Sequence, residues 1–507
     1  TDSSVIHYDR QCRRTWETLN QARSIAVTIA DEAGLALSQD EAGVIRWMRL
    51  ADGQKLLSFF PSLAGRSWTT WTPLGHYDAS AEGEALVGWH VNRDRHREAL
   101  FYGAGRFRDL FHNPDEITRS LTQTDRMAQD AEVGRALELG RAMRDRLPPQ
   151  VRIVSTQEKK GKEGLVAQLS FALRVPTGDS AVRVRALVNG RPAGTALALA
   201  IEDGKEETLG QIFVPLPEDE VEIALIAESR GVAGEPAKLR LHERLADGSM
   251  AASAQLRPRL YALVVGVAKY QSARVPPLDF PAKDARDFAQ ALRTQSGQLY
   301  RAVDVRLLTD EKATRESIID GMDWLRREVT ANDIAVVFFA GHGVNDSISQ
   351  YYFLPSNSDI ARLRSTAISN VDIVETLQSL PSKVLAFLDT CHSGNVLGTG
   401  KKRALGDINR LVNELTSAEN GVVVFASSTG QETSQESPEW NNGAFTKALV
   451  EGLSGRGDFN RDGVISLNEL NLWVADRVKE LSGGEQHANM IRPDSIRDFP
   501  FSLTGKP

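Results

Sequence analysis

The sequence predicts a multidomain protein in which an α/β domain with a parallel sheet follows two β-rich parts. Before about residue 245, apolar side chains recur mainly with the period of two that β-strands have. Beyond Arg257, short apolar runs alternate with amphipathic helical stretches. The length of 507 residues also suggests about three or four domains. We therefore expect a β-rich segment over 1–120, a connecting helix over 121–147, a β-sandwich over 148–245 and the α/β domain over 257–507.

The first segment contains a series of short predicted strands between residues 24 and 62, one of which ends at Trp47. This pattern resembles one blade of a WD-repeat propeller. Because one blade cannot close a propeller, further blades would precede Thr1 or the sheet would pack elsewhere. A first residue that is not Met indicates a processed chain or a piece of a longer one. The many aromatic residues between Trp68 and Phe111 indicate a packed layer, with a binding site as the alternative.

The second β-rich part begins after a charged, helix-forming stretch that Pro148 and Pro149 end. From Val151 to Leu241 the apolar residues alternate, and Asn189-Gly190 has the composition of a two-residue hairpin turn. Strands spaced by roughly 8 to 12 residues predict an immunoglobulin-like sandwich. No residue pattern in it has evident chemistry, so we expect a spacer or docking module.

The α/β domain is predicted from apolar runs such as Ala335–Phe339, which are apolar on both faces like parallel strands covered by helices. We expect strands at 260–267, 303–308, 334–340, 384–388 and 422–426. Helices are expected near 282–293, 314–328, 371–380 and 445–453. Ligands of such sheets bind outside the carboxyl ends of the strands, and catalytic residues are expected there.

Two of these strand ends carry reactive side chains. The strand at 334–340 runs into Gly341-His342-Gly343, and the strand at 384–388 runs into a loop that contains Cys391. A thiol needs a neighbouring base to become the nucleophilic thiolate, and an imidazole can take that proton and return it to a leaving amine. We expect Cys391 to be the nucleophile and His342 the base, with backbone amides near Gly343 and Cys391 holding the oxyanion.

Other interpretations exist for each residue alone. A lone cysteine after a buried strand is often a small core residue, and a lone histidine is often structural. The combination at two strand ends favours catalysis. His392 is the competing base, but a residue directly after Cys391 should point to the other face of the strand.

The two motifs, Gly341-His342-Gly343 and Asp389-Thr390-Cys391-His392-Ser393-Gly394, resemble those of the metacaspase and bacterial caspase-like branch of the caspase family. The separation of His342 and Cys391 is close to the ~50 residues typical of caspases. The resemblance covers about 257–492 and implies a caspase-like thiol peptidase. Asp389 and Thr390 stand where caspases have Gln-Ala, which argues against the aspartate preference of true caspases.

Resemblance to metacaspases implies cleavage after Arg or Lys in a substrate pocket lined by acidic residues. Asp389 matches one such position and Asp284 the other. Two carboxylates would suit a guanidinium, which can pair with both. The alternative for Asp284 is an acid near a helix N-terminus that interacts with the macrodipole.

Lys401-Lys402-Arg403 follows the proposed nucleophile in a glycine-containing segment. A peptidase that cleaves after basic residues could process itself at Lys401, Lys402 or Arg403. The alternative is an exposed charged loop.

Residues 458–469 match the twelve-residue EF-hand loop. Asp458, Asn460 and Asp462 would supply side-chain oxygens, Val464 its carbonyl and Glu469 a bidentate carboxylate. EF-hands usually occur in pairs and the sequence has no second loop, so a turn that binds no metal is the alternative. Calcium is the ligand that the loop motif predicts. The peptidase reaction itself is expected to require no cofactor.

The composition limits the partners. A formal net charge of −7 gives no general attraction to nucleic acid or anionic membranes, and no apolar run reaches the ~18 residues of a membrane span. Two cysteines provide no disulfide framework, which favours a cytoplasmic location. We expect an endopeptidase acting on proteins after Arg or Lys, silent until triggered, with its β-rich parts available to a regulatory partner. The alternative is a caspase-like signalling scaffold without activity.

Overall fold

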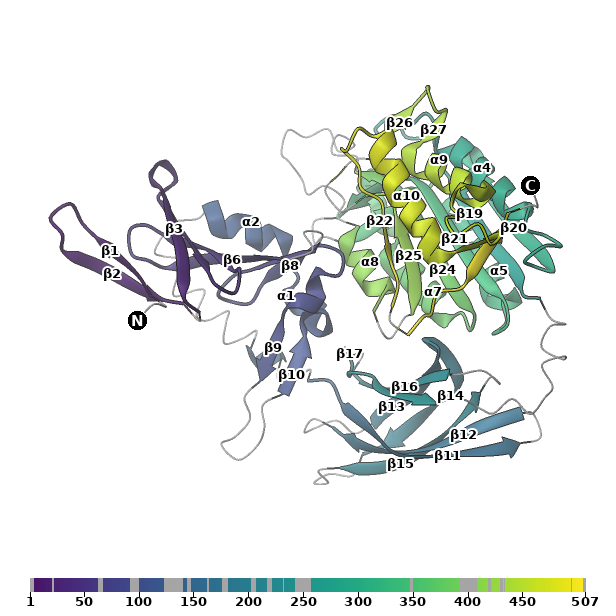
Figure 1. The fold of residues 1–507 in the computed structure, drawn as a ribbon, viewed down its shortest axis with the longest axis horizontal. Helices are drawn as coiled ribbons and strands as arrows, with labels where there is room; N and C mark the ends of the chain where they lie inside the picture. Colours follow the sequence, from purple (N-terminus) through teal and green to yellow (C-terminus); the bar gives the residue numbers. More distant parts are fainter. Residues whose placement is uncertain are drawn as a thin grey trace. The chain divides into compact units, whose positions relative to one another are not determined.

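The computed structural model divides into two compact units, Thr1–Leu147 and Pro148–Pro507, which we describe separately (Figure 1). It describes residues 4–20, 22–62, 67–91, 100–122, 140–143, 147–161, 164–175, 181–201, 207–216, 221–230, 232–241, 257–346, 350–392, 408–417, 421–428, 432, 434–493 and 495–504. Most of the connecting helix predicted over 121–147 lies outside these residues.

The first unit is built on one antiparallel sheet in which six strands follow one another in chain order. These strands are β3 (Ser24–Ala30), β4 (Leu35–Asp40), β5 (Ile45–Arg49), β6 (Lys55–Pro61), β7 (Trp68–Trp71) and β8 (Tyr77–Ala79). Two hairpins, β1 (Ser4–Tyr8) with β2 (Arg14–Leu19) and β9 (Gly88–Val91) with β10 (Leu100–Gly103), and the helices α1 (Arg108–Phe111) and α2 (Pro114–Thr122) complete it. The propeller arrangement stays a prediction.

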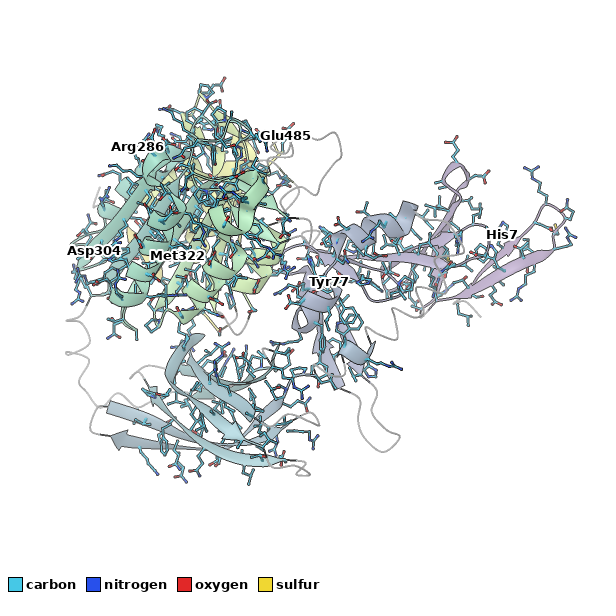
Figure 2. The ribbon with its side chains drawn as sticks, turned by 180° about the vertical axis from the view of Figure 1, so that it is seen from behind. His7, Tyr77, Arg286, Asp304, Met322 and Glu485 are labelled. Carbon is cyan, nitrogen blue, oxygen red and sulfur yellow. The ribbon has the colours of Figure 1, made fainter. Side chains whose placement is uncertain are left out.

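The aromatic residues of this unit mostly form a core, as predicted. Tyr77, Tyr102, Phe107 and Phe111 are buried in one cluster, and Tyr77 is labelled in Figure 2. Phe101 and Tyr8 are exceptions, because 63% and 54% of them are exposed.

The second unit begins with two facing antiparallel sheets that share one core. One sheet has the order β11 (Gln150–Gly161), β12 (Gly164–Arg174), β15 (Thr208–Leu216). The other contains β13 (Ala181–Val188), β14 (Arg191–Ala200), β16 (Val221–Ser229), β17 (Val232–Ala233) and β18 (Ala237–Leu241). Asn189 and Gly190 both have positive φ and join β13 to β14, which confirms the predicted hairpin. An immunoglobulin-like strand order stays a prediction.

The remainder is an α/β domain whose central strands run in the order β20-β19-β21-β24-β25-β29 (Figure 1). The first five pair in parallel: β19 (Arg259–Gly266), β20 (Ala302–Thr309), β21 (Ile334–Asn345), β24 (Lys383–His392) and β25 (Val422–Ala426). Shorter strands are β22 (Tyr351–Phe353), β23 (Ile368–Ser369), β26 (Glu436–Ser437), β27 (Asn442–Gly443), β28 (Val464–Ser466), β29 (Asn489–Ile491) and β30 (Pro500–Leu503).

Helices cover both faces of this sheet. They are α4 (Pro281–Arg293), α5 (Arg315–Glu328), α6 (Leu363–Thr366), α7 (Asn370–Ser379), α8 (Asn409–Leu415), α9 (Ala444–Glu451) and α10 (Leu467–Leu481). On one face Phe288 of α4 stacks on Phe338 and contacts Phe387 of the central strands. On the other, Trp324 of α5 contacts Tyr261 of β19 edge to face. Both faces of the parallel strands are therefore buried, as their uninterrupted apolar sequences predict.

Strands β21 and β24 extend beyond the predicted ends at 340 and 388. The last three residues of β21, Gly343–Asn345, pair with β22, and β24 stays paired with β21 as far as His392. These additional backbone hydrogen bonds keep both strands extended. His342 and Cys391 thus lie within strands, and the prediction that they lie in loops is wrong.

The sandwich is attached to the α/β domain through Arg191, at the start of β14. Its guanidinium donates hydrogen bonds to the carbonyl oxygens of Leu377 (2.9 Å), Leu380 and Gly421 (3.3 Å). Two of these carbonyls belong to or directly follow the carboxyl end of α7, where the helix dipole favours a cation. Arg191 is only 4% exposed, and no sequence pattern pointed to it.

Candidate active site

The predicted catalytic residues are brought together by strand register. His342 of β21 pairs directly with Cys391 of β24, and the two strands are parallel neighbours. The backbones of paired residues on neighbouring strands lie about 5 Å apart. The backbone of Cys391 is described, whereas its side chain lies outside the described part of the structure.

The imidazole of His342 is buried and held from two sides. Its Nε2 lies 2.8 Å from the carbonyl oxygen of Pro276, and its ring stacks on Tyr270 with centroids 5.1 Å apart. The carbonyl can only accept, so Nε2 carries the hydrogen and Nδ1 is the basic nitrogen of this tautomer. Burial lowers the pKa of His342, an effect that the Pro276 carbonyl partly opposes. The imidazole is therefore neutral at pH 7 and able to accept a proton.

Tyr270 also fixes the backbone beside this imidazole. Its hydroxyl accepts a hydrogen bond from the amide of His342 (2.9 Å) and donates one to the carbonyl of Val267 (3.1 Å). Gly341 has φ +145°, and a Cβ there would lie 3.0 Å from the Tyr270 hydroxyl oxygen. Sequence reasoning found the glycine beside His342 but missed Tyr270 and Pro276, since both lie in the irregular segment between β19 and α4.

Gly343, the predicted oxyanion donor, follows His342 in β21 and pairs with His392. A Cβ at Gly343 would lie 2.7 Å from the ring of Tyr351, so only glycine fits without a shift of that ring.

The two predicted acidic residues meet at Gly443. A Cβ added to Gly443 would lie 3.1 Å from Oδ2 of Asp284 and 3.4 Å from Oδ2 of Asp389. Both aspartates are buried. Burial, and next the charge of Asp389, raise the pKa of Asp284 to about 8, although hydrogen bonds from Asn442 and Gly443 act in the opposite direction. Burial also raises the pKa of Asp389 to about 6, against hydrogen bonds from the hydroxyls of Ser434, Ser427 and Thr446.

A third carboxylate, Glu436, belongs to the same group. Burial raises its pKa to about 7, with further contributions from the charges of Asp389 and Asp279. Its Oε2 accepts a hydrogen bond from the amide of Asp279 (3.2 Å). We refer to Asp284, Asp389 and Glu436 as the acidic cluster. Glu436 lies in the two-residue strand β26, too short to leave a periodic signal in the sequence.

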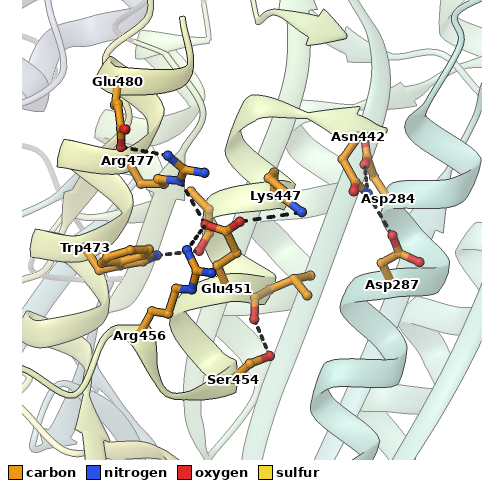
Figure 3. A network of polar contacts seen from close by, with 12 residues as sticks. Asp284, Asp287, Asn442, Lys447, Glu451, Ser454, Arg456, Trp473, Arg477 and Glu480 are labelled. Carbon is orange, nitrogen blue, oxygen red and sulfur yellow. Dashed lines mark hydrogen bonds and ion pairs between the residues drawn. The ribbon is translucent and has the colours of Figure 1, made fainter. Parts of the chain in front are cut away.

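Asn442 holds Asp284 in place (Figure 3). Its Nδ2 donates to Oδ1 of Asp284 and to Oδ2 of Asp287, both at 2.8 Å, and the amide of Gly443 donates to Asp284 at 3.2 Å. Asp284 lies in the first turn of α4, as the helix-dipole alternative requires. Its carboxylate nevertheless accepts hydrogen bonds from both residues of β27.

The EF-hand-like residues form a loop held by its own amides. Asp458 accepts from the amides of Asp462 and Gly463, and Asp462 accepts from the amide of Val464. Glu469 accepts from the amide of Ser466 in a capping box at the start of α10. Asn460 accepts from the amide of Asp462 (2.9 Å). Among the described residues, no three His, Cys, Asp or Glu side chains are arranged to hold a metal, so calcium binding stays a prediction.

The remaining predictions are tested less directly. The predicted processing residues Lys401, Lys402 and Arg403 lie outside the described residues. Within the described part of the chain, no helix has the length and apolarity that a membrane span requires.

Residues 259–500 match the caspase domain family, peptidase C14. The α/β domain is therefore caspase-like, and the match supports a cysteine peptidase. Two curated relatives are fungal proteins named Metacaspase-1. The one from Lodderomyces elongisporus is 29% identical over 157 residues, 27% of this chain and 34% of the relative. The one from Candida glabrata is 26% identical over 160 residues, 28% of this chain and 39% of the relative.

The chain thus spans little more than a third of the curated relatives that it matches. A solved structure of a protein from Geobacter sulfurreducens aligns with 49% of this chain and 100% of its own, at 17% identity and a TM-score of 0.36. The structure of pro-sf-caspase-1 aligns with 49% of this chain and 93% of its own, at 13% identity and a TM-score of 0.30.

Proposed function

We propose that the protein is a cysteine endopeptidase that cleaves after Arg or Lys, with Cys391 as nucleophile and His342 as base. The observation that carries this proposal is the position of the acidic cluster. Asp389 lies on β24 two residues before Cys391, and Gly443 brings Asp284 beside it. A buried group of carboxylates with raised pKa values, next to a Cys–His pair, suits a cationic substrate side chain.

The chemistry follows from the tautomer of His342. Nδ1 takes the proton of the Cys391 thiol, and the thiolate sulfur forms a bond to the carbonyl carbon of the peptide. Amides near Gly343 and Cys391 stabilise the oxyanion that develops. The carbon–nitrogen bond then breaks as the imidazolium gives its proton to the leaving amine. Water, deprotonated by His342, hydrolyses the thioester and restores the thiol.

The acidic cluster would select the residue before the cleaved bond. A guanidinium has five donors in a planar fork, so it can bind more than one carboxylate at once, whereas an ammonium binds as a point charge. Binding would replace the protons held by the cluster with the substrate's charge. We therefore expect Arg to be preferred over Lys, and Asp to be excluded.

The test is hydrolysis of fluorogenic peptides that end in Arg, Lys or Asp, with Cys391→Ala as control. Cleavage after Arg or Lys that is lost in Cys391→Ala is the expected result. Cleavage only after Asp would contradict the assigned specificity. A wild-type chain that hydrolyses none of the peptides, and whose Cys391 does not react with an arginyl chloromethyl ketone, would favour a scaffold instead.

A further inference from the structure

Residues that follow β25 contact the acidic cluster. We call the described residues 427, 428, 432 and 434–436 the serine loop. The hydroxyls of Ser427 and Ser434 hydrogen-bond to Asp389 and lie 2.6 Å from each other. Glu436, at the other end of the loop, is a member of the acidic cluster. The position of the serine loop therefore affects two of the three carboxylates, Asp389 and Glu436.

Gln486 joins the two ends of this loop. Its side-chain Nε2 donates to the carbonyl of Ser427 (2.7 Å), and its Oε1 accepts from the amide of Gln435 (2.8 Å). Gln486 is 0% exposed. A buried amide whose donor and acceptor are both used by backbone groups fixes the distance between those groups, because an unmet bond inside the protein is costly.

The neighbours of Gln486 contact the same loop from outside. Glu485 accepts from the side chain of Gln435 (2.7 Å), and Glu432 accepts from the amide of His487 (2.8 Å). Glu485 lies near the upper end of the α/β domain in Figure 2, the end at which Figure 1 places β26 and β27. Three consecutive residues after α10 thus hold the serine loop, and only the middle one is buried.

We propose that Gln486 is a positioning residue for substrate specificity: it holds Ser427 and Glu436 at the spacing that a guanidinium requires. This inference rests on the proposed peptidase function. The side chain of Gln486 affects the acidic cluster through the serine loop. Its hydrogen bonds to described residues go to that loop and not to His342 or the backbone of Cys391. Its loss should therefore weaken binding of the Arg side chain while the reactivity of the thiol is preserved.

The test compares Gln486→Met with Gln295→Met in the full chain. Gln295 is also buried, and its side chain likewise donates to a backbone carbonyl and accepts from a backbone amide, both of Leu503. Leu503 is in β30, which pairs with β28 and not with the serine loop. Each variant removes one hydrogen bond to a backbone carbonyl and one from a backbone amide, and the variants differ in which segment loses this pair. Gln295→Met also removes a longer hydrogen bond to the hydroxyl of Thr294 (3.4 Å).

Three quantities are measured for each variant: kcat and KM with a fluorogenic Arg peptide, the rate at which iodoacetamide alkylates Cys391, and the melting temperature. We expect Gln486→Met to raise KM by about tenfold, the effect of losing one or two hydrogen bonds at the site. We expect Gln295→Met to leave KM within about twofold at a comparable loss of melting temperature. Alkylation, which needs no Arg side chain, should proceed at the wild-type rate in both.

An equal rise of KM in both variants, or an unchanged KM in Gln486→Met, would overturn the positioning role and leave the peptidase assignment intact. A fall in kcat and in alkylation rate at constant KM would overturn it too, because the residue would then act on the thiol. Wild-type protein that does not cleave the Arg peptide would instead overturn the proposed function, and the inference with it.

Discussion

Buried charged side chains lie at both edges of the sheet of the α/β domain, and they are stabilised differently at the two edges. At the amino edge, Arg191 ends on the carbonyls of Leu377, Leu380 and Gly421. Burial lowers the pKa of Arg191 to about 9, so it remains charged at pH 7. At the carboxyl edge, burial raises the pKa values of all three members of the acidic cluster to between about 6 and 8.

The difference distinguishes a contact that joins two parts of the protein from a proposed binding site. The carbonyls around Arg191 give its guanidinium acceptors, so the protein itself completes that contact. The acidic cluster has amide and hydroxyl donors but, among the described residues, no basic side chain hydrogen-bonded to it, so part of its charge is neutralised by protons. A buried charge that the fold does not compensate is a reason to expect a ligand that does.

The largest effect should come from Asp284→Asn. We expect kcat/KM for an Arg peptide to fall by roughly 1,000-fold, about 4 kcal/mol, because one carboxylate of a buried charge pair is lost. The same variant should raise the free energy of unfolding at pH 8, since a buried group no longer has to ionise. Asp287→Asn is the matched control, because Asp287 shares the Asn442 contact but is partly exposed. Equal losses of kcat/KM in both variants would show that Asp284 contributes no more than Asp287 to recognition of the Arg side chain.

Arg191→Met should have the opposite profile. We expect the free energy of unfolding, measured with urea, to fall by about 2–3 kcal/mol, because buried carbonyls lose their donor. Peptide hydrolysis should change by less than about threefold. Arg183→Met, an exposed arginine in the same sheet, is the control and should leave stability unchanged. A large loss of activity in Arg191→Met would show that the two edges are coupled.

The pH dependence of binding sharpens the same comparison. The cluster must lose protons to bind a cation, so affinity should rise with pH through the range of about 6 to 8. We expect roughly a tenfold gain between pH 6 and pH 8 for each proton released there. Calorimetry of an Arg peptide on Cys391→Ala measures this without interference from catalysis. Affinity that is constant over this range would contradict protonated carboxylates.

The smallest effect concerns the loop at 458–469, whose carboxylates already accept hydrogen bonds from backbone amides. If the loop binds calcium, Glu469 must leave the amide of Ser466 to become a ligand. Calcium at several times its Kd should then raise the free energy of unfolding by about 1 kcal/mol. Glu469→Gln can keep the capping box and should abolish that gain. A gain of equal size in the variant would exclude Glu469 as a ligand.

The sequence predicted the regular parts of the α/β domain closely. The helix expected at 314–328 is Arg315–Glu328, with Thr314 as its N-cap, because capping and apolar period are local properties. His342 and Cys391 were predicted because each follows an apolar strand run, whereas Asp284 and Asp389 were predicted from the resemblance to metacaspases. The direct pairing of His342 with Cys391 was not predicted, since it depends on the register of β21 against β24, two segments distant in the chain.

Other parts of the site left no signal that one sequence could show. Glu436 and Asn442 lie in two-residue strands, and Tyr270 and Pro276 lie in an irregular segment. Gln486 acts through contacts with residues about fifty to sixty positions away in the chain. These residues reach the site through tertiary packing, and no periodicity or turn composition reports tertiary packing.

The hydrogen-bond partner of the proposed base, His342, has a consequence for mutational screens. Nε2 of His342 is held by the main-chain carbonyl of Pro276, and every amino acid at position 276 would supply that oxygen. An alanine scan would therefore classify position 276 as tolerant, although the main-chain carbonyl oxygen of this residue sets the tautomer of His342. Insertions or deletions between β19 and α4, which displace the carbonyl itself, are the lesions that a deep mutational screen should find intolerable there.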